Sequence, residues 1–283
     1  MSAPQRGWRR RWRAKREPRR ETLGESVRTL ATAVVLALAI RTLLLQTFYV
    51  PSGSMLETLL IGDHVFVNKV LYGVRIPWTD WRLPGIREPA RGDVVVFEAA
   101  RARDGRRVIA ADRRPELRRE DFIKRIVAGP GDLVEVRQGI LYVNGDRVTG
   151  GPVGRRFENP EGRALDVLDE TVPRCSYHVL DDPVRGPIDL APVRVEEGRY
   201  LMMGDNRDDS HDGRFFGTVR LQEILGSAGL IYWSWDWNGP WGPGCLMPFD
   251  AACLGDSLLN PLTWSRNLIE RTRWRRLGDS VSC

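Results

Sequence analysis

The stretch at residues 133–148, LVEVRQGILYVNGDRV, decides the fold class of this 283-residue chain. Apolar and polar residues alternate along it, and a period of two is typical of a β-strand with two unlike faces. Asn144-Gly145 favours the type I′ turn of a tight hairpin. The stretch therefore predicts consecutive antiparallel strands.

Short strand-like runs bounded by Gly, Pro or Asp recur on both sides of this stretch. They are HVFVNKV at 64–70, DVVVFEA at 93–99, DFIKRIV at 121–127 and RYLMMGD at 199–205. The pattern predicts a mostly β chain, with an antiparallel β-sheet or barrel-like domain over residues 46–283. Two polar interruptions, residues 99–120 and 147–198, are predicted to be surface insertions, and residues 238–283 a C-terminal segment.

Upstream of the strands, residues 27–45 read VRTLATAVVLALAIRTLLL, an apolar stretch with Arg28 and Arg41 near its ends. This length is enough for a helix to cross a bilayer, and an Arg near the end of a span can extend to the interface. A cleaved signal peptide is the alternative, but no A-x-A site follows the stretch. We expect a single N-terminal transmembrane helix.

Charge is distributed unevenly along the chain. The net charge is +6, but residues 1–28 hold ten Arg and Lys against three Glu, so the remainder is slightly acidic. A basic domain that binds nucleic acid is therefore not supported. The positive-inside rule places the basic tail, residues 1–26, in the cytoplasm. We expect the β domain on the outer side of the inner (cytoplasmic) membrane, with membrane lipid as a partner.

Near the C-terminal end of the predicted domain, Ile231, Trp233, Trp235 and Trp237 occupy alternate positions of one strand. One face of that strand is thus almost wholly aromatic. Two interpretations remain open: the aromatic face packs in the core, or it enters the headgroup region of the membrane.

The four cysteines are Cys175, Cys245, Cys253 and Cys283. A location outside the cytoplasm permits disulfides. Cys245 and Cys253 flank a seven-residue loop, and closing a loop that short contributes about 2–3 kcal/mol. We predict a Cys245–Cys253 bridge. The spacing of the cysteines matches no zinc motif, and we expect no metal and no cofactor.

PSGSM at residues 51–55 directly follows the apolar stretch. A Ser in such a turn is most often only a turn residue. Its position is more informative, because a Ser on a tight turn just outside the membrane would meet a polypeptide emerging from the bilayer. A Ser of this turn is therefore a candidate nucleophile.

A serine nucleophile needs a base. The histidines share no motif, although His211 beside Ser210 in a polar loop is one candidate. Only three of the 43 Lys and Arg residues are lysines, and one of them, Lys124, lies inside the apolar run DFIKRIV. Lysine can lose its proton when desolvated and arginine cannot, so Lys124 is a second candidate.

Residues 204–217, GDNRDDSHDGRFFG, follow a predicted strand and are too polar for a plain hairpin loop. Several aspartates lie close together, but their spacing does not follow the EF-hand pattern. With PSGSM, the strand containing KR followed by GPGD, and GDNRDDSxDxR in this order, the chain resembles the bacterial type I signal peptidases. The resemblance covers about residues 27–237.

The resemblance implies a membrane-bound serine endopeptidase that removes signal peptides from exported preproteins after an Ala-x-Ala-like site. It implies that Ser54 is the nucleophile and Lys124 its general base. Ser52 matches the hydroxyl that joins the backbone N–H of Ser54 in the oxyanion hole. Ser210 matches the serine that orients the lysine amine.

The same resemblance supplies supporting residues. Asp212 and Arg214 match a supporting ion pair. The remaining members of this group are Asp205, Asn206, Arg207 and, next to the lysine, Arg125. The chain departs from the commonest form of the last motif at Asp209, where Asn is frequent, and at Gly213.

The chemistry is consistent with this assignment. An exposed lysine has a pKa near ~10.4, so only about one molecule in 2,500 is neutral at pH 7. Lowering that pKa by roughly 2–3 pH units takes about 3–4 kcal/mol, which desolvation in the FIKRIV strand could supply.

The resemblance also implies small apolar pockets near Ser54, including Phe48, Val50 and Met55, that would accept Ala at the first and third positions before the cut. The extended substrate would add a strand to the cleft edge. Two alternatives stay open. One is a Ser/Lys peptidase of the same superfamily with a narrow client. The other is a non-enzymatic, membrane-tethered envelope binding module, against which the intact serines and lysine argue.

Overall fold

The computed structural model describes residues 23–76, 79, 81–101, 108–109, 118–236 and 269–283. The chain divides into two compact units, residues 1–40 and 41–283. Helix α1 (Leu23–Leu43) covers most of the predicted transmembrane stretch. Within the described part of the chain, no helix combines the length and the apolar character needed to cross a bilayer, so the predicted span is not confirmed.

The largest sheet contains eight antiparallel strands in the order β1-β2-β15-β3-β5-β13-β14, with β4 paired to β3. The four runs predicted as strands form β2, β3, β5 and β13, which confirms those predictions. The strands of this sheet are β1 (Leu45–Tyr49), β2 (Asp63–Asn68), β3 (Val94–Arg101), β4 (Val108–Ile109), β5 (Arg118–Ala128), β13 (Arg199–Met203), β14 (Val219–Arg220) and β15 (Ile224–Ser234).

The stretch that decided the fold class forms β6 (Leu133–Arg137), β7 (Ile140–Val143) and β8 (Asp146–Arg147), which pair with β12 (Leu190–Arg194) in a second sheet. Asn144 and Gly145 have φ angles of 56° and 87°, so the predicted two-residue turn is confirmed. An unpredicted second turn of this kind, Gln138-Gly139 with φ of 52° and 75°, joins β6 to β7. Positive φ at both central positions is what such a turn requires.

The region predicted as a surface insertion at 147–198 is instead part of the folded core. It forms β9 (Thr149–Glu158), β10 (Ala164–Val172), β11 (Cys175–Asp181) and β12, and the first three make a separate sheet. Along β10, buried positions such as Val167 alternate with partly exposed ones. Val179 of β11 packs with Val134 and Val136 of β6. The prediction is wrong because the polar average composition hides apolar residues on one inward face.

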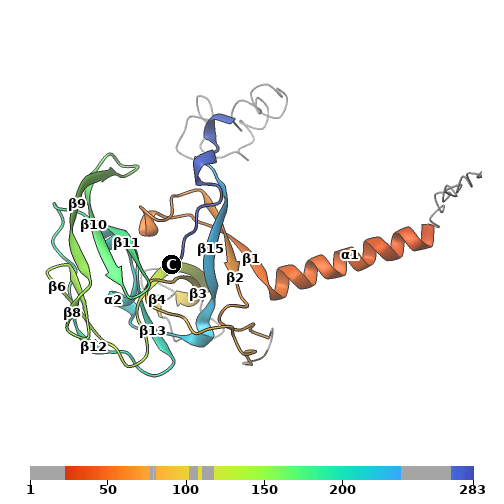
Figure 1. The fold of residues 1–283 in the computed structure, drawn as a ribbon, viewed down its shortest axis with the longest axis horizontal. Coiled ribbons are helices and arrows are strands. Elements are labelled where there is room, and N and C mark those ends of the chain that lie inside the picture. The colour runs from red at the N-terminus through yellow and green to blue at the C-terminus, as the bar shows by residue number, and fades with distance from the viewer. Residues whose placement is uncertain (1–22, 77–78, 80, 102–107, 110–117, 237–268) are drawn as a thin grey trace, which may run out of the picture. The chain divides into compact units, whose positions relative to one another are not determined.

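The small sheets lie together on one side of the domain, away from β1 and β2 (Figure 1). The other predicted insertion, 99–120, is partly strand as well. β3 and β5 continue their pairing as far as Arg101 and Arg118, and β4 pairs with the end of β3. Residues 102–107 and 110–117 lie outside the described part of the chain.

The last residues of the chain return to the large sheet. Val281 N donates to the Gly229 carbonyl of β15 at 2.9 Å. Ser282 Oγ accepts from Val94 N at 3.0 Å and donates to the Ala228 carbonyl at 2.8 Å, so it bridges β3 and β15. The side chain of Val281 is buried in the core beneath.

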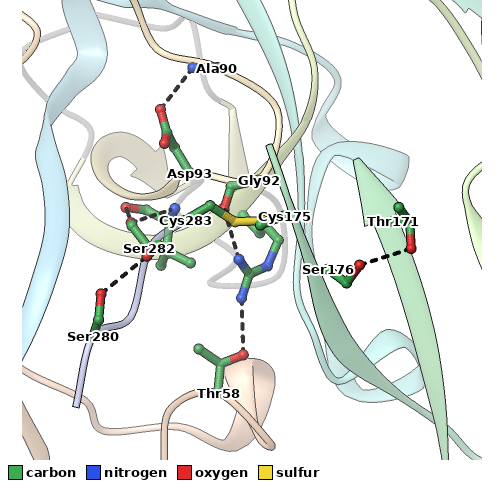
Figure 2. Close-up of a disulfide and its surroundings, with 12 residues drawn as sticks. Thr58, Ala90, Gly92, Asp93, Thr171, Cys175, Ser176, Ser280, Ser282 and Cys283 are labelled. Carbon is green, nitrogen blue, oxygen red and sulfur yellow. Dashed lines mark hydrogen bonds between the residues drawn. A yellow bond between two sulfur atoms is a disulfide. The ribbon is translucent and has the colours of Figure 1, made fainter. Parts of the chain in front are cut away.

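A disulfide joins Cys175 at the start of β11 to Cys283, with a Cα–Cα distance of 5.8 Å. The sulfur of Cys283 lies 3.4 Å from the Gly92 carbonyl oxygen, and Figure 2 shows the bridge beside that residue. The predicted pair, Cys245 and Cys253, lies outside the described residues. The bridge fastens β11 of the small sheet to the segment that borders β3 and β15.

The aromatic residues at the end of β15 are half-buried. Trp233 stacks on Trp235 with ring centroids 6.4 Å apart and meets the edge of Trp274 at 6.0 Å. Trp237 lies outside the described residues. In the described part, Ile231 of this face is buried in the core, whereas Trp233 and Trp235 form a partly exposed cluster with Trp274.

Candidate active site

Ser54 lies on a short 3-10 turn, η1 (Gly53–Met55), shortly after β1. The Leu56 N–H donates to the Gly53 carbonyl at 3.1 Å and closes the turn. The Met55 side chain is completely buried and anchors the turn in the core. The serine is therefore held on a turn that is fixed by its neighbours in sequence.

Lys124 lies in the middle of β5, opposite Val95 of β3. Its side chain is only 3 % exposed. Its Nζ donates to Ser54 Oγ at 2.5 Å. Two residues 70 positions apart in the sequence are thus brought into direct contact.

The environment of Lys124 favours its neutral form. Burial strips water from the ammonium group and lowers the pKa of Lys124 to about 8, although Asp212 and Asp205 act in the opposite direction. Near pH 8 about half of the molecules therefore carry an uncharged amine. An uncharged amine in contact with a serine hydroxyl can accept its proton.

Arg125, the next residue on β5, binds a carboxylate instead. Its Nε and Nη2 donate to the two carboxylate oxygens of Asp205 at 2.8 and 2.7 Å, and both residues are buried. Thr58, just after the serine turn, donates to Asp205 at 2.5 Å and accepts from Arg125 at 3.0 Å. Burial alone would lower the pKa of Arg125, but the Asp205 carboxylate raises it. This pair connects β5, the serine turn and the polar loop.

Asp212 and Arg214 form the predicted ion pair. Arg214 Nε and Nη2 each donate to the Asp212 carboxylate at 2.9 Å, and Gly204 N donates to it at 3.0 Å. Burial opposes ionisation of this carboxyl, but Arg214 holds the pKa of Asp212 below its ordinary value. The loop therefore places a fixed negative charge close enough to affect Lys124.

Ser210 belongs to this loop, and Gly204 of the same loop lies between its side chain and the serine turn. A Cβ on Gly204 would come within 2.2 Å of Ser210 Oγ and 2.5 Å of the Ser54 carbonyl oxygen, so only glycine fits there. Ser210 Oγ is buried and, within the described residues, makes no hydrogen bond of normal geometry. The predicted hydrogen bond between Ser210 and the lysine amine is not formed in this structure.

Asn206 holds the backbone of the serine turn. Its Nδ2 donates to the Gly53 carbonyl at 3.0 Å, and its N–H donates to the Ser54 carbonyl at 3.2 Å. Both bonds occupy carbonyl groups of the turn. Asn206 is thus the direct link between the polar loop and the candidate nucleophile.

Arg207 forms a second buried pair that sequence reasoning missed. Its guanidinium binds both carboxylate oxygens of Glu170, one at 2.6 Å, and Thr149 donates to Glu170 at 2.6 Å. Glu170 is fully buried on β10. An acidic residue among the inward positions of a strand signals a buried partner, but this signal was hidden by the interpretation of residues 147–198 as a surface insertion.

The remaining predicted residues surround the serine turn. Ser52 is the exposed residue immediately before η1, and its side chain does not cap that turn. Phe48, Val50 and Met55 belong to one apolar cluster, in which Val50 and Met55 are buried. His211 is exposed and stacks on Phe215 with ring centroids 5.0 Å apart. Among the described residues, no three His, Cys, Asp or Glu side chains converge as metal ligands would.

Comparison with known proteins identifies the same group of enzymes. The sequence profile of the family described as "Signal peptidase, peptidase S26" matches residues 23–233. Signal peptidase I of Pseudomonas aeruginosa is 34 % identical over 71 % of this chain and 69 % of its own length. The probable signal peptidase I-2 of Synechocystis sp. is 32 % identical over 77 % of both chains. A crystal structure of a signal peptidase I from Enterococcus faecalis is 25 % identical and covers 50 % of this chain and 98 % of its own, with a TM-score of 0.29.

Proposed function

Because this chain belongs to the signal peptidase family, peptidase S26, we propose that it removes signal peptides from exported preproteins with a Ser54–Lys124 dyad. The observation that carries the proposal is the 2.5 Å contact between Lys124 Nζ and Ser54 Oγ, made by an amine whose pKa is lowered to about 8. The buried charge pairs around the dyad supply the rigidity that such a contact needs.

In the first step, Ser54 Oγ attacks the scissile carbonyl and its proton passes to the neutral amine of Lys124. A tetrahedral intermediate forms, and its oxyanion accepts hydrogen bonds from the Ser54 N–H and the Ser52 hydroxyl. The side chain of Ser52 does not cap η1 and is exposed, which fits this role. Loss of one such donor typically reduces the rate about 10²–10³-fold.

Collapse of the intermediate breaks the C–N bond, and the lysine ammonium returns its proton to the departing amine of the mature protein. An acyl-enzyme ester on Ser54 remains. Lys124, neutral again, then takes a proton from a water molecule that attacks the ester. The C–O bond of the ester breaks, the lysine ammonium returns the proton to Ser54 Oγ, and the carboxyl end of the signal peptide is released. Ser210 makes no hydrogen bond to the lysine amine in this structure, so we assign it no step in this mechanism.

The substrate is proposed to bind as an added strand. β1 pairs with β2 on one side, and no strand of the described sheet pairs with its other side. A peptide bound along that free edge would lead directly to Ser54. The apolar cluster with Phe48, Val50 and Met55 lies under this edge, and we propose that it limits the residue before the cut to a small side chain such as Ala.

We also propose a location for the domain. Residues 27–45 would anchor the chain in the cytoplasmic membrane, with the basic tail of residues 1–26 inside and the catalytic domain outside. Cleavage sites emerging from the bilayer would then reach Ser54 first. Protease added outside spheroplasts should digest the catalytic domain and spare the tail.

The direct test is cleavage of a preprotein with an A-x-A site by the detergent-solubilised full chain. Sequencing should place the new N-terminus immediately after the second Ala. Replacing that Ala by Leu in the substrate should abolish cleavage, and the Ser54→Ala enzyme should be inactive. Cleavage at another site, or cleavage by Ser54→Ala, would overturn the proposal. A panel of unrelated preproteins separates a general enzyme from a narrow-client peptidase.

A further inference from the structure

Glu57, shortly after the serine turn, has a backbone conformation that usually requires glycine. Its φ is +79°. The other described non-glycine residues with positive φ, Gln138 and Asn144, lie in two-residue hairpin turns, where such angles are needed. Leu56, with φ of −53° and ψ of 153°, and Glu57 together resemble the two central positions of a type II turn. The second of these positions favours Gly or Asn, and a larger residue there is strained.

The carboxylate of Glu57 binds a residue of a different sheet. Arg155 of β9 donates to both carboxylate oxygens, from Nη1 at 3.3 Å and also from Nη2. The same Nη2 lies 3.2 Å from Nδ1 of His178 on β11. The side chains of Arg155 and Glu57 are 47 % and 16 % exposed, and an ion pair as open to water as this one adds little to folding stability. Stability therefore does not explain why a strained glutamate occupies this position.

The residue before Glu57 is attached to the same sheet of β9, β10 and β11. Leu56 is buried in an apolar cluster with Leu165 of β10 and Leu180 of β11. Apolar burial is non-directional and holds the segment against the sheet without fixing its exact position. The paired contact between a guanidinium and a carboxylate has a defined geometry. The ion pair thus supplies the directional part of this attachment.

Glu57 also lies between two residues of the proposed active site. Ser54 is three positions before it, and Thr58 directly follows it and donates to Asp205 at 2.5 Å. A backbone shift at residue 57 would be passed on to both neighbours within one turn of chain. Strained residues that are held by their surroundings concentrate at functional sites.

We propose that Glu57 is a positioning residue for Ser54, and that its ion pair with Arg155 fixes the serine turn against the sheet of β9, β10 and β11. The inference rests on the proposed Ser54–Lys124 peptidase function and adds this sheet to the parts of the molecule that set the catalytic geometry. Glu57 acts through the backbone of the turn. Loss of the pair should therefore lower turnover without weakening substrate binding.

Steady-state kinetics of the full chain on a soluble peptide with an A-x-A site tests the pair. Glu57→Gln and Arg155→Gln should each lower kcat about fivefold and leave KM within about twofold. The double variant should lose no more than either single variant, because both substitutions remove the same contact. The matched control is Arg156→Gln, which breaks the exposed pair with Asp166 at the next position of β9 and should keep full activity.

Glu57→Gly separates positioning from stability. Glycine accepts a φ of +79° without strain, so the melting temperature should not fall, whereas kcat should fall at least as far as in Glu57→Gln. A melting temperature that falls together with kcat would show a merely structural role and overturn the proposal. Normal turnover of Arg155→Gln would also overturn it, as would losses that add up in the double variant.

Amide hydrogen exchange reads the turn independently of activity. The Leu56 N–H donates to the Gly53 carbonyl, and the Leu59 N–H donates to the Met55 carbonyl at 2.7 Å. Both amides should exchange about fivefold faster in Arg155→Gln than in the unaltered enzyme or in Arg156→Gln. Equal exchange in the three proteins would contradict the positioning role. An unaltered enzyme that cleaves no preprotein would count against the proposed function, and the exchange rates would still decide whether the pair fixes the turn.

Discussion

Lys124 and Arg125 are neighbours on one strand, both are buried, and their surroundings are opposite in character. Successive side chains of a strand point to opposite faces. Lys124 therefore meets the uncharged hydroxyl of Ser54, whereas Arg125 meets the carboxylate of Asp205. Burial lowers the pKa of Lys124 to about 8, and the carboxylate raises that of Arg125.

This difference separates Lys124, which takes part in the proposed reaction, from Arg125, which stabilises the site around it. A buried cation that is bound to a carboxylate stays charged and stabilises the geometry around it. A buried amine that is bound to a neutral hydroxyl can lose its proton. We infer that one face of β5 does chemistry and that the opposite face holds β5, the serine turn and the polar loop in register.

The largest effect is expected when the proton-accepting amine is removed. Lys124→Arg keeps the charge but cannot become neutral, so peptidase activity should fall by about 10³-fold or more, as for Ser54→Ala. Lys124→Met, which is apolar and of similar length, covers the case in which the arginine variant does not fold. It should be equally inactive, and its melting temperature should not be lower than that of the unaltered enzyme. Lys69→Arg is the matched control and should keep full activity. A Lys124→Arg enzyme with more than about a tenth of normal turnover would show that the amine only stabilises charge, and His211 would then be tested as the base.

Breaking the supporting pair should affect stability first. Asp205→Asn leaves Arg125 buried without its carboxylate, which should cost about 3–5 kcal/mol of unfolding free energy. Asp166→Asn removes the partner of Arg156 in an exposed pair and should cost less than about 1 kcal/mol. Urea denaturation measures both. Similar losses for the two variants would mean that burial gives the Arg125 pair no special role.

Loosening the serine turn should have a smaller effect on activity. Asn206→Ala removes the side-chain bond to the Gly53 carbonyl, and we expect turnover to fall about tenfold because the nucleophile is less well positioned. The pH dependence should keep its midpoint, since the charges around Lys124 are unchanged. A shifted midpoint would indicate that Asn206 acts on the lysine and not on the turn.

The smallest expected effect is a change in pH dependence. The reaction needs neutral Lys124, so the rate should rise with pH through a midpoint at the lysine pKa of about 8 and level off above it. The Asp212 carboxylate raises the pKa of Lys124. Asp212→Asn should therefore shift the midpoint of the pH–rate profile to lower pH. A shift to higher pH would contradict the assigned electrostatics.

The sequence predicted the strands and the turn well where the pattern is local. Alternation at residues 133–148 and Asn144-Gly145 determine backbone geometry within a few residues, and the structure confirms both. Motif order pointed to Ser54 and Lys124 before any distance was known. Only tertiary structure brings these residues together, because they are 70 positions apart in the sequence.

Predictions from average composition failed where charged residues are buried in pairs. The polar region 147–198 contains Glu170, which is matched by Arg207 far along the chain. In the sequence, a buried charged residue whose partner lies far along the chain looks the same as a charged residue that faces water. The disulfide shows the same limit, since Cys175 and Cys283 are 108 positions apart and loop length gives no indication of their pairing.

The central claim is that burial lowers the pKa of Lys124 far enough for its neutral amine to be well populated near pH 8, and NMR titration of lysine side chains tests it most directly. The chain has three lysines, at 15, 69 and 124, so ¹³Cε resonances of selectively labelled enzyme can be assigned with Lys124→Met. We predict that Lys124 titrates with a pKa of about 8. Titration at its ordinary value of 10.5 would contradict the proposed role of Lys124 as general base.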